Sequence, residues 1–109
     1  MTRDVFIAGI SMTQFGKRPD DSVKSLTAAA VREALEDAGI GASDIRAAWF
    51  ANTRQPMLEG QNTIRGQIAL RAAGISAIPI ANIENACASG STAVLQAMAA
   101  IRAEMIDVA

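Results

Sequence analysis

The pattern of hydrophobic and polar positions divides this chain into short apolar runs separated by longer amphipathic stretches. Residues 5–10 and 47–51 are apolar without polar alternation, and this predicts strands that are buried on both faces. Residues 78–83, with Pro79 near their start, predict a third strand. Residues 106–109 have the pattern of a fourth strand that is cut short where the sequence stops.

Between these runs, apolar side chains recur at helical spacing. The predicted helices span residues 22–38, 62–73 and 91–103. Ser22 is the expected N-cap of the first helix, and Asn62 or Thr63 is expected to cap the second. The first two helices are each followed by Ala-Gly-Ile, a sequence typical of a helix ending in which glycine adopts a left-handed conformation and isoleucine folds back onto the helix.

The predicted order is strand, helix, strand, helix, strand, helix and the start of a fourth strand. This order is typical of an α/β fold with a mostly parallel sheet and crossover helices. Residues 52–60 are mostly polar and include Pro56, so we expect a loop at the carboxyl end of the second strand, where sites of open α/β sheets gather. We expect residues 1–109 to form one incomplete domain.

Composition restricts the function classes. The chain has 109 residues, of which 50% are hydrophobic and 19% charged, as expected of one folded domain. The net charge is −1 without a basic stripe, which argues against nucleic-acid binding. No apolar run reaches about 18 residues, so we expect no membrane span. The one cysteine allows no internal disulfide, and we therefore expect a cytoplasmic protein. The sequence has no histidine, and we expect no metal site.

The candidate for chemistry is Cys87, at the predicted turn from the third strand into the third helix. Its neighbours in residues 84–91 include Ala, Ser and Gly, which would let a substrate carbonyl approach the sulfur. The start of a helix would also favour a thiolate there. A lone cysteine is often an inert, buried small hydrophobe, and this alternative stays open from the residues alone because the chain supplies no histidine as a base.

Residues 83–93, Ile-Glu-Asn-Ala-Cys-Ala-Ser-Gly-Ser-Thr-Ala, resemble the active-site segment of the thiolase superfamily, in which a polar residue precedes the nucleophilic cysteine and Ser-Gly follows it. Residues 5–16 and 60–70 resemble the opening strand of thiolases and the stretch that leads into the helix before the cysteine strand. The run Cys-Ala-Ser-Gly-Ser at 87–91 departs from the Cys-Ser-Ser-Gly and Cys-Gly-Ser-Gly runs of degradative and biosynthetic thiolases. It looks closer to sterol-carrier-protein-associated and archaeal-type thiolases. The resemblance covers nearly the whole chain.

The resemblance implies the N-terminal portion of a thiolase-like fold and an acyl-CoA acyltransferase. Cys87 would accept an acyl group as a thioester, and a second acyl-CoA would attack it to give a 3-ketoacyl-CoA. The implied substrates are coenzyme A thioesters, with no permanently bound cofactor, and the implied assembly is a homo-oligomer, either a dimer or a tetramer. The histidine and second cysteine of the family have no counterpart here, so we expect the 109 residues alone to be inactive. The residues that bind coenzyme A stay unassigned.

Other functions stay open at this stage. A ketoacyl or hydroxymethylglutaryl-CoA synthase also uses a cysteine in this segment, and a thiolase-like scaffold subunit would keep the fold without the chemistry. A redox-sensing thiol is disfavoured because no resolving cysteine is present. Around Cys87, we expect Asn85 to orient the turn through hydrogen bonds to backbone, and Ser89 and Ser91 to cap the helix. Contact with substrate stays open as an alternative role of Ser89.

Overall fold

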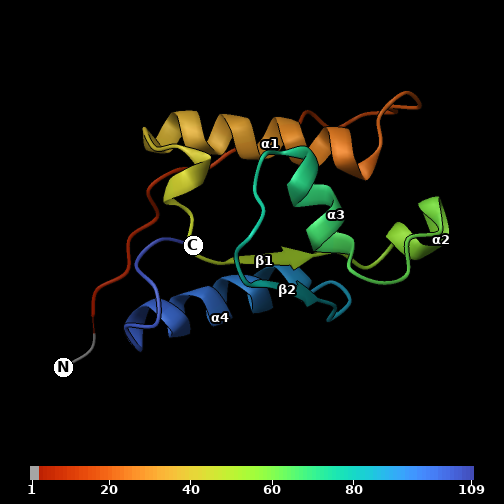
Figure 1. Ribbon diagram of the computed structural model, residues 1–109. Helices are drawn as coiled ribbons and strands as arrows, with labels where there is room; N and C mark the ends of the chain where they lie inside the picture. Colours follow the sequence, from red (N-terminus) through yellow and green to blue (C-terminus); the bar gives the residue numbers. More distant parts are fainter. Residues whose placement is uncertain (1–2) are drawn as a thin grey trace.

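The computed structural model describes residues 3–109 and shows an α/β arrangement around a two-stranded parallel sheet (Figure 1). The strands are β1 (Ala48–Ala51) and β2 (Ile80–Ile83), paired from Ala48 opposite Ile80 to Ala51 opposite Ile83. The helices are α1 (Val23–Ala38), α2 (Gln55–Glu59), α3 (Arg65–Ala72) and α4 (Ser89–Arg102), and a short 3-10 helix spans Ala42–Asp44. The predicted fold class is confirmed, with fewer strands than expected.

The sheet lies between helices. In Figure 1, α3 covers one face and α4 the opposite face, while α1 packs against α3. The centre of the apolar core consists of Ile45, Leu70 and Ile75, which come from the segment before β1, from α3 and from the segment before β2. The carboxyl ends of the two strands therefore emerge side by side at one edge of this sandwich.

Gly66 lets α3 approach the sheet closely. A Cβ at this position would lie 2.5 Å from Cβ of Phe50 on β1 and 2.9 Å from Oδ1 of Asn82 on β2. The same Asn82 oxygen accepts a hydrogen bond from the Gly66 amide at 2.6 Å, and Nδ2 of Asn82 donates to Oε1 of Gln67 at 2.8 Å. The Asn82 side chain thus satisfies one of the free amides at the start of α3 and fixes that helix against β2.

The start of α1 confirms the predicted N-cap. The Ser22 hydroxyl accepts a hydrogen bond from the Ser25 amide at 3.1 Å, and the Ser25 hydroxyl accepts one from the Ser22 amide at 2.9 Å. Before the helix, the Arg18 guanidinium donates to the Asp21 carboxylate at 2.6 Å. Hydrogen bonds from Arg18 and Ser25 lower the pKa of Asp21 in the folded protein. Because this ion pair is exposed, it adds only a little stability, which is present above the unfolded pKa of Asp21 and is lost as the pH falls through its folded pKa.

Replacing Ser22 by alanine is expected to lower the free energy of unfolding by about 1 kcal/mol, because the Ser25 amide loses its acceptor. Urea unfolding measures this loss. Ser43→Ala is the matched control, since Ser43 is exposed and makes no side-chain hydrogen bond within residues 3–109. Equal unfolding midpoints for the two variants would show that the cap does not stabilise α1.

The helices α1 and α3 both end in the loop that Ala-Gly-Ile predicts. Gly39 has φ 70° and Gly74 has φ 81°, both in the left-handed region. The amide of the isoleucine after each glycine donates to a leucine carbonyl in the last helical turn, at 3.2 and 2.9 Å. The helix α4 ends in the same way with Glu104 at φ 57°, and the Met105 amide donates to the Ala100 carbonyl at 3.1 Å.

The predicted strand at residues 5–10 is wrong in this structure. The segment forms no strand, and Phe6 and Ile7 are 83% and 82% exposed rather than buried. It runs along α1 instead, where Gly9 lies against Ala34 and Ala38. The reason is that a strand needs a neighbouring backbone to pair with, and an apolar run by itself does not specify that partner.

Other elements also differ from expectation. Residues 106–109 form no strand. The Arg46 amide donates to the Val108 carbonyl at 3.0 Å, but a single hydrogen bond does not form a β-ladder. The expected loop at 52–60 contains the short helix α2. Pro56 lies in its first turn, where a helix tolerates proline because the missing amide would have no helical partner there. The N-cap of α3 is Ile64, with φ 46° and no side-chain cap, rather than a polar neighbour.

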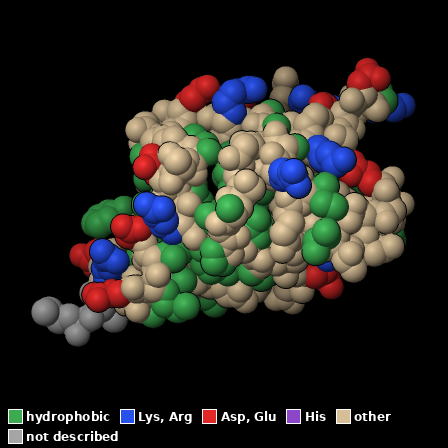
Figure 2. All heavy atoms as spheres, viewed as in Figure 1, with side chains coloured by type: hydrophobic (Ala, Val, Ile, Leu, Met, Phe, Trp, Pro, Cys, Tyr) green, Lys and Arg blue, Asp and Glu red, His purple; other side chains and the backbone are tan. Residues whose placement is uncertain are grey.

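Acidic and basic side chains lie interspersed on the face drawn in Figure 2. None of the helices within residues 3–109 combines the length and apolar character that crossing a bilayer requires.

Candidate functional site

The candidate site lies at the edge where β1 and β2 both end. Asn52 and Thr53 follow β1, and residues 84–88 form the turn from β2 into α4. Cys87 is exposed on this turn, two residues before Ser89, the first residue of α4. The expectation that Cys87 sits at a strand-to-helix turn is therefore confirmed, and the alternative of a sulfur buried in apolar packing is wrong.

The turn has an unusual backbone at the residue before the cysteine. Ala86 has φ 46°, in the left-handed region that a residue with a Cβ adopts at a cost. Its amide donates to the Glu84 carboxylate at 2.6 Å. The amides of Ala88 and Ser89 close the turn on the carbonyls of Asn85 and Ala86, at 2.9 and 3.2 Å. This compact turn leaves the Cys87 side chain on the outside.

Ser89 is a residue whose role the sequence did not predict correctly. It is 6% exposed and forms the first residue of α4, so it does not act as an N-cap, and Ala88 takes that position without a side-chain cap. Its hydroxyl accepts a hydrogen bond from the Asn85 amide at 2.8 Å and donates to the Ala86 carbonyl at 2.7 Å. Ser89 therefore ties the turn together from inside, and the expected capping role is wrong.

Asn85 orients the turn by a different route from the one expected. Its side-chain Nδ2 donates to the Thr92 hydroxyl at 3.0 Å rather than to backbone, and Thr92 in turn donates to the Ala88 carbonyl at 2.8 Å. Ser91 is exposed and caps no helix. Within residues 3–109, the amides of Gly90 and Ser91 donate no hydrogen bond, so the first turn of α4 presents free N–H groups near Cys87.

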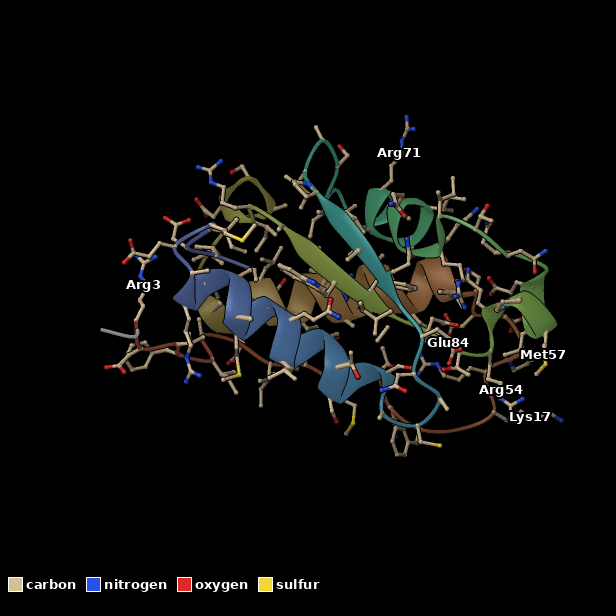
Figure 3. All side chains as sticks on the ribbon, turned by 90° about the horizontal axis from the view of Figure 1, so that it is seen from below. Arg3, Lys17, Arg54, Met57, Arg71 and Glu84 are labelled. Atoms are coloured by element: carbon tan, nitrogen blue, oxygen red, sulfur yellow. The ribbon has the colours of Figure 1, made fainter. Side chains whose placement is uncertain are left out.

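The loop after β1 is fixed by side chains that the sequence did not single out. Asn52 accepts a hydrogen bond from the Gln55 amide through Oδ1, at 2.8 Å, and its carbonyl accepts one from the Arg65 guanidinium at 2.8 Å. Gln55 is only 2% exposed. Figure 3 shows Glu84 at the end of β2 on the same side of the molecule as Arg54 and α2. The two strand ends thus form one structured region.

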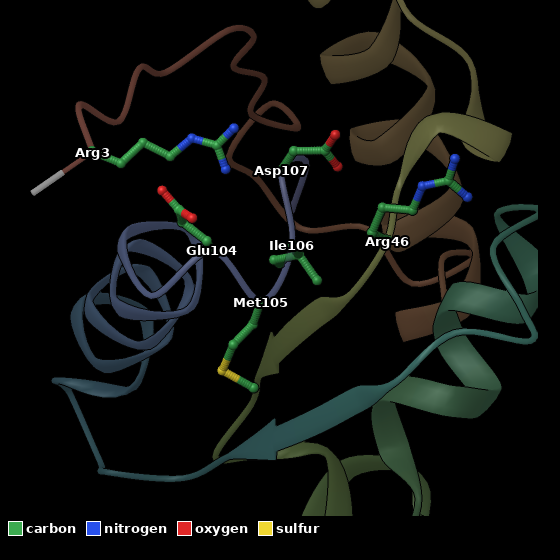
Figure 4. Close-up of a pocket in the computed structure, with 6 residues that line it drawn as sticks. All are labelled: Arg3, Arg46, Glu104, Met105, Ile106 and Asp107. Atoms are coloured by element: carbon green, nitrogen blue, oxygen red, sulfur yellow. The ribbon is translucent and has the colours of Figure 1, made fainter.

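Cys87 does not line either of two open hollows on the surface of residues 3–109. The larger, of about 510 Å³, lies between the N-terminal segment and the end of α4, and Figure 4 shows its charged lining residues Arg3, Arg46, Glu104 and Asp107. The smaller, of about 270 Å³, lies between α1 and the end of β1 and includes Asn52. Across residues 3–109, no group of three or more His, Cys, Asp and Glu side chains is arranged to hold a metal ion.

Comparison with known proteins identifies the family. The family model for the thiolase N-terminal domain matches residues 5–109. An acetyl-CoA acetyltransferase of Methanocaldococcus jannaschii is 39% identical over 97% of this chain and 27% of its own length. An acetyl-CoA acetyltransferase of Methanothermobacter thermautotrophicus is 34% identical over the same shares. Sterol carrier protein 2 of Gallus gallus is 33% identical over 98% of this chain and 19% of its own length.

The chain belongs to the thiolase family and corresponds to its N-terminal part. The resemblance that residues 83–93 indicate is thereby confirmed. The chain spans 27% of the length of the two archaeal relatives, so most of each relative has no counterpart in these residues.

Proposed function

We propose that the protein is a thiolase-type acyl-CoA acyltransferase in which Cys87 accepts the acyl group. The observation that carries this proposal is the exposed Cys87 sulfur on a tight turn directly before α4, within a chain of the thiolase family. Two archaeal relatives are named acetyl-CoA acetyltransferases, which supports acetyl-CoA as a substrate of this protein.

The chemistry begins with attack of the Cys87 thiolate on the carbonyl carbon of an acyl-CoA thioester. The new carbon–sulfur bond to Cys87 forms, the bond to the sulfur of coenzyme A breaks, and coenzyme A leaves as a thiolate that takes up the proton lost by the cysteine. A second acyl-CoA then loses an α-proton and attacks the acyl-cysteine, which releases Cys87 and gives a 3-ketoacyl-CoA. The covalent intermediate divides one difficult step into two easier ones.

The residues around Cys87 support the first step by geometry. The free amides of Gly90 and Ser91 point from a helix start, where backbone N–H groups favour negative charge. Small neighbours such as Ala86 and Ala88 leave the sulfur accessible. The proposed reaction uses no metal and no permanently bound cofactor. We also propose that the protein is cytoplasmic and forms a homo-oligomer. Within residues 3–109, each strand has one edge without a strand partner, which further chain or a second copy could cover.

The proposal is tested by incubating the full-length protein with acetyl-CoA and locating the acyl group by mass spectrometry of its peptides. We expect an acetyl group on the peptide that contains Cys87. A protein that carries no acetyl group there would favour a non-catalytic scaffold subunit of the thiolase fold. A condensing synthase would be distinguished by its products, because it would not cleave 3-ketoacyl-CoA with free coenzyme A.

The isolated 109-residue chain is expected to show no turnover in a thiolysis assay with acetoacetyl-CoA. The reason is that these residues contain no histidine and one cysteine, so no imidazole can remove the proton from Cys87 and no second thiol can serve as an acid. The full-length protein at the same concentration is the control. CoA-dependent cleavage by the isolated chain at the rate of the control would contradict the need for a base from elsewhere.

A further inference from the structure

Two hydroxyl groups from separate strand ends meet beneath the turn that carries Cys87. Thr53 follows β1 and Ser89 begins α4, 36 residues later, and their Oγ atoms lie 3.2 Å apart. Ser89 is buried and Thr53 is half-buried. The pair therefore lies within the fold, while Cys87 lies on the outer side of the same turn.

The protons of this pair converge on one carbonyl. Ser89 donates to the Ala86 carbonyl at 2.7 Å and accepts from the Asn85 amide at 2.8 Å. A serine hydroxyl has one proton, so the contact between the two hydroxyls needs Thr53 as its donor. The Thr53 proton has two acceptors at the same distance, 3.2 Å, which are Ser89 Oγ and the Ala86 carbonyl itself. Donation to the Ala86 carbonyl restrains that carbonyl directly, and donation to Ser89 Oγ restrains it through Ser89.

The restrained carbonyl fixes the peptide unit that leads into Cys87. It belongs to the peptide unit that joins Ala86 to Cys87, and that unit is planar, with C=O and N–H pointing in opposite directions. Holding the carbonyl toward Thr53 and Ser89 therefore directs the Cys87 amide away from them. Ala86, which carries this carbonyl, has φ 46°, a backbone conformation that costs free energy for a residue with a Cβ.

We propose that Thr53 and Ser89 are positioning residues that hold the Cys87 thiol in the orientation for acyl transfer. This inference rests on the proposed function, since it assigns the pair a role in the reaction of that same sulfur. The two residues act through the Ala86 carbonyl and do not touch the substrate. Their removal should therefore slow the chemical step without weakening the binding of acyl-CoA.

The test uses Thr53→Val and Ser89→Ala in the full-length protein. Valine has nearly the shape of threonine, so Thr53→Val removes the hydroxyl with little change in packing. We expect kcat for CoA-dependent acyl transfer to fall about tenfold in each variant, with KM for acetyl-CoA within about twofold of the parent. We expect the double variant to lose little more than the more affected single variant, because both hydroxyls act on one carbonyl. Thr53→Ser keeps the hydroxyl and should retain the parental kcat.

Thr63→Val is the matched control, because Thr63 is exposed in the segment before α3 and makes no side-chain hydrogen bond within residues 3–109. Thermal unfolding of every variant separates slow chemistry from loss of fold. A parent that is acylated on Cys87, with Thr53→Val and Ser89→Ala matching its kcat, would overturn the positioning role alone. A parent that takes no acyl group from acetyl-CoA would overturn the proposed function and the positioning role together.

Discussion

Replacing Cys87 by alanine is expected to abolish acylation of the protein by acetyl-CoA and to lower acyl-transfer activity by roughly a thousandfold or more. The proposed reaction passes through a bond to the Cys87 sulfur, which is the one thiol among these 109 residues. Mass spectrometry after incubation with acetyl-CoA and a thiolysis assay, both on the full-length protein, measure the two effects.

Cys87→Ser separates loss of the nucleophile from a change of shape. Serine is close to cysteine in size and would preserve the turn, but its hydroxyl is a poor nucleophile without strong activation. Because Cys87 is exposed, neither substitution should change the thermal unfolding midpoint appreciably. An alanine variant with the parental rate of thiolysis would rule out the acyl-cysteine mechanism, whatever the fold.

Replacing Gly66 by alanine is expected to lower the free energy of unfolding by about 2 kcal/mol or more. The added methyl would lie 2.5 Å from Cβ of Phe50, an atom attached directly to the backbone of β1 that cannot swing aside. Relief requires α3 to move off the sheet, which would also stretch the hydrogen bond from the Gly66 amide to Asn82. Urea denaturation of the variant and the parent measures the loss.

Gly41→Ala is the matched control for this substitution. A Cβ at Gly41 would lie 3.7 Å from Asp44 Oδ2, at ordinary van der Waals distance, and the expected change is within about 0.5 kcal/mol. If Gly66→Ala unfolds at the same urea concentration as Gly41→Ala, the close approach of α3 to the sheet does not contribute to stability as described.

Local signals in the sequence predicted the helices better than the sheet. Ser22 and the two Ala-Gly-Ile endings mark helix boundaries through bonds between residues a few positions apart, so the local sequence contains the information. The end of α4 was predicted to within one residue, but its left-handed residue was not, because Glu104 occupies a position that glycine usually takes. Residues 5–10 failed as a strand because pairing depends on a distant backbone, which hydrophobicity alone does not identify.

The candidate site shows the same division. The position of Cys87 at a strand-to-helix turn follows from the local pattern and the small residues around it. The contact between Thr53 and Ser89 joins residues 36 positions apart, and no periodicity or motif connects them. The burial of Gln55 was missed for a related reason, since a polar residue in a polar stretch gives no sign of being enclosed.

The pairing register of β2 against β1 has a consequence for the turn that carries Cys87. The loop after α3 sets where β2 begins, and side chains along a strand alternate between its two faces. A shift of β2 by one residue against β1 would turn the Asn82 side chain to the opposite face of the sheet and leave the Gly66 amide without its acceptor. The same shift would move the turn that carries Cys87 relative to the end of β1, so the site depends on the register of β2.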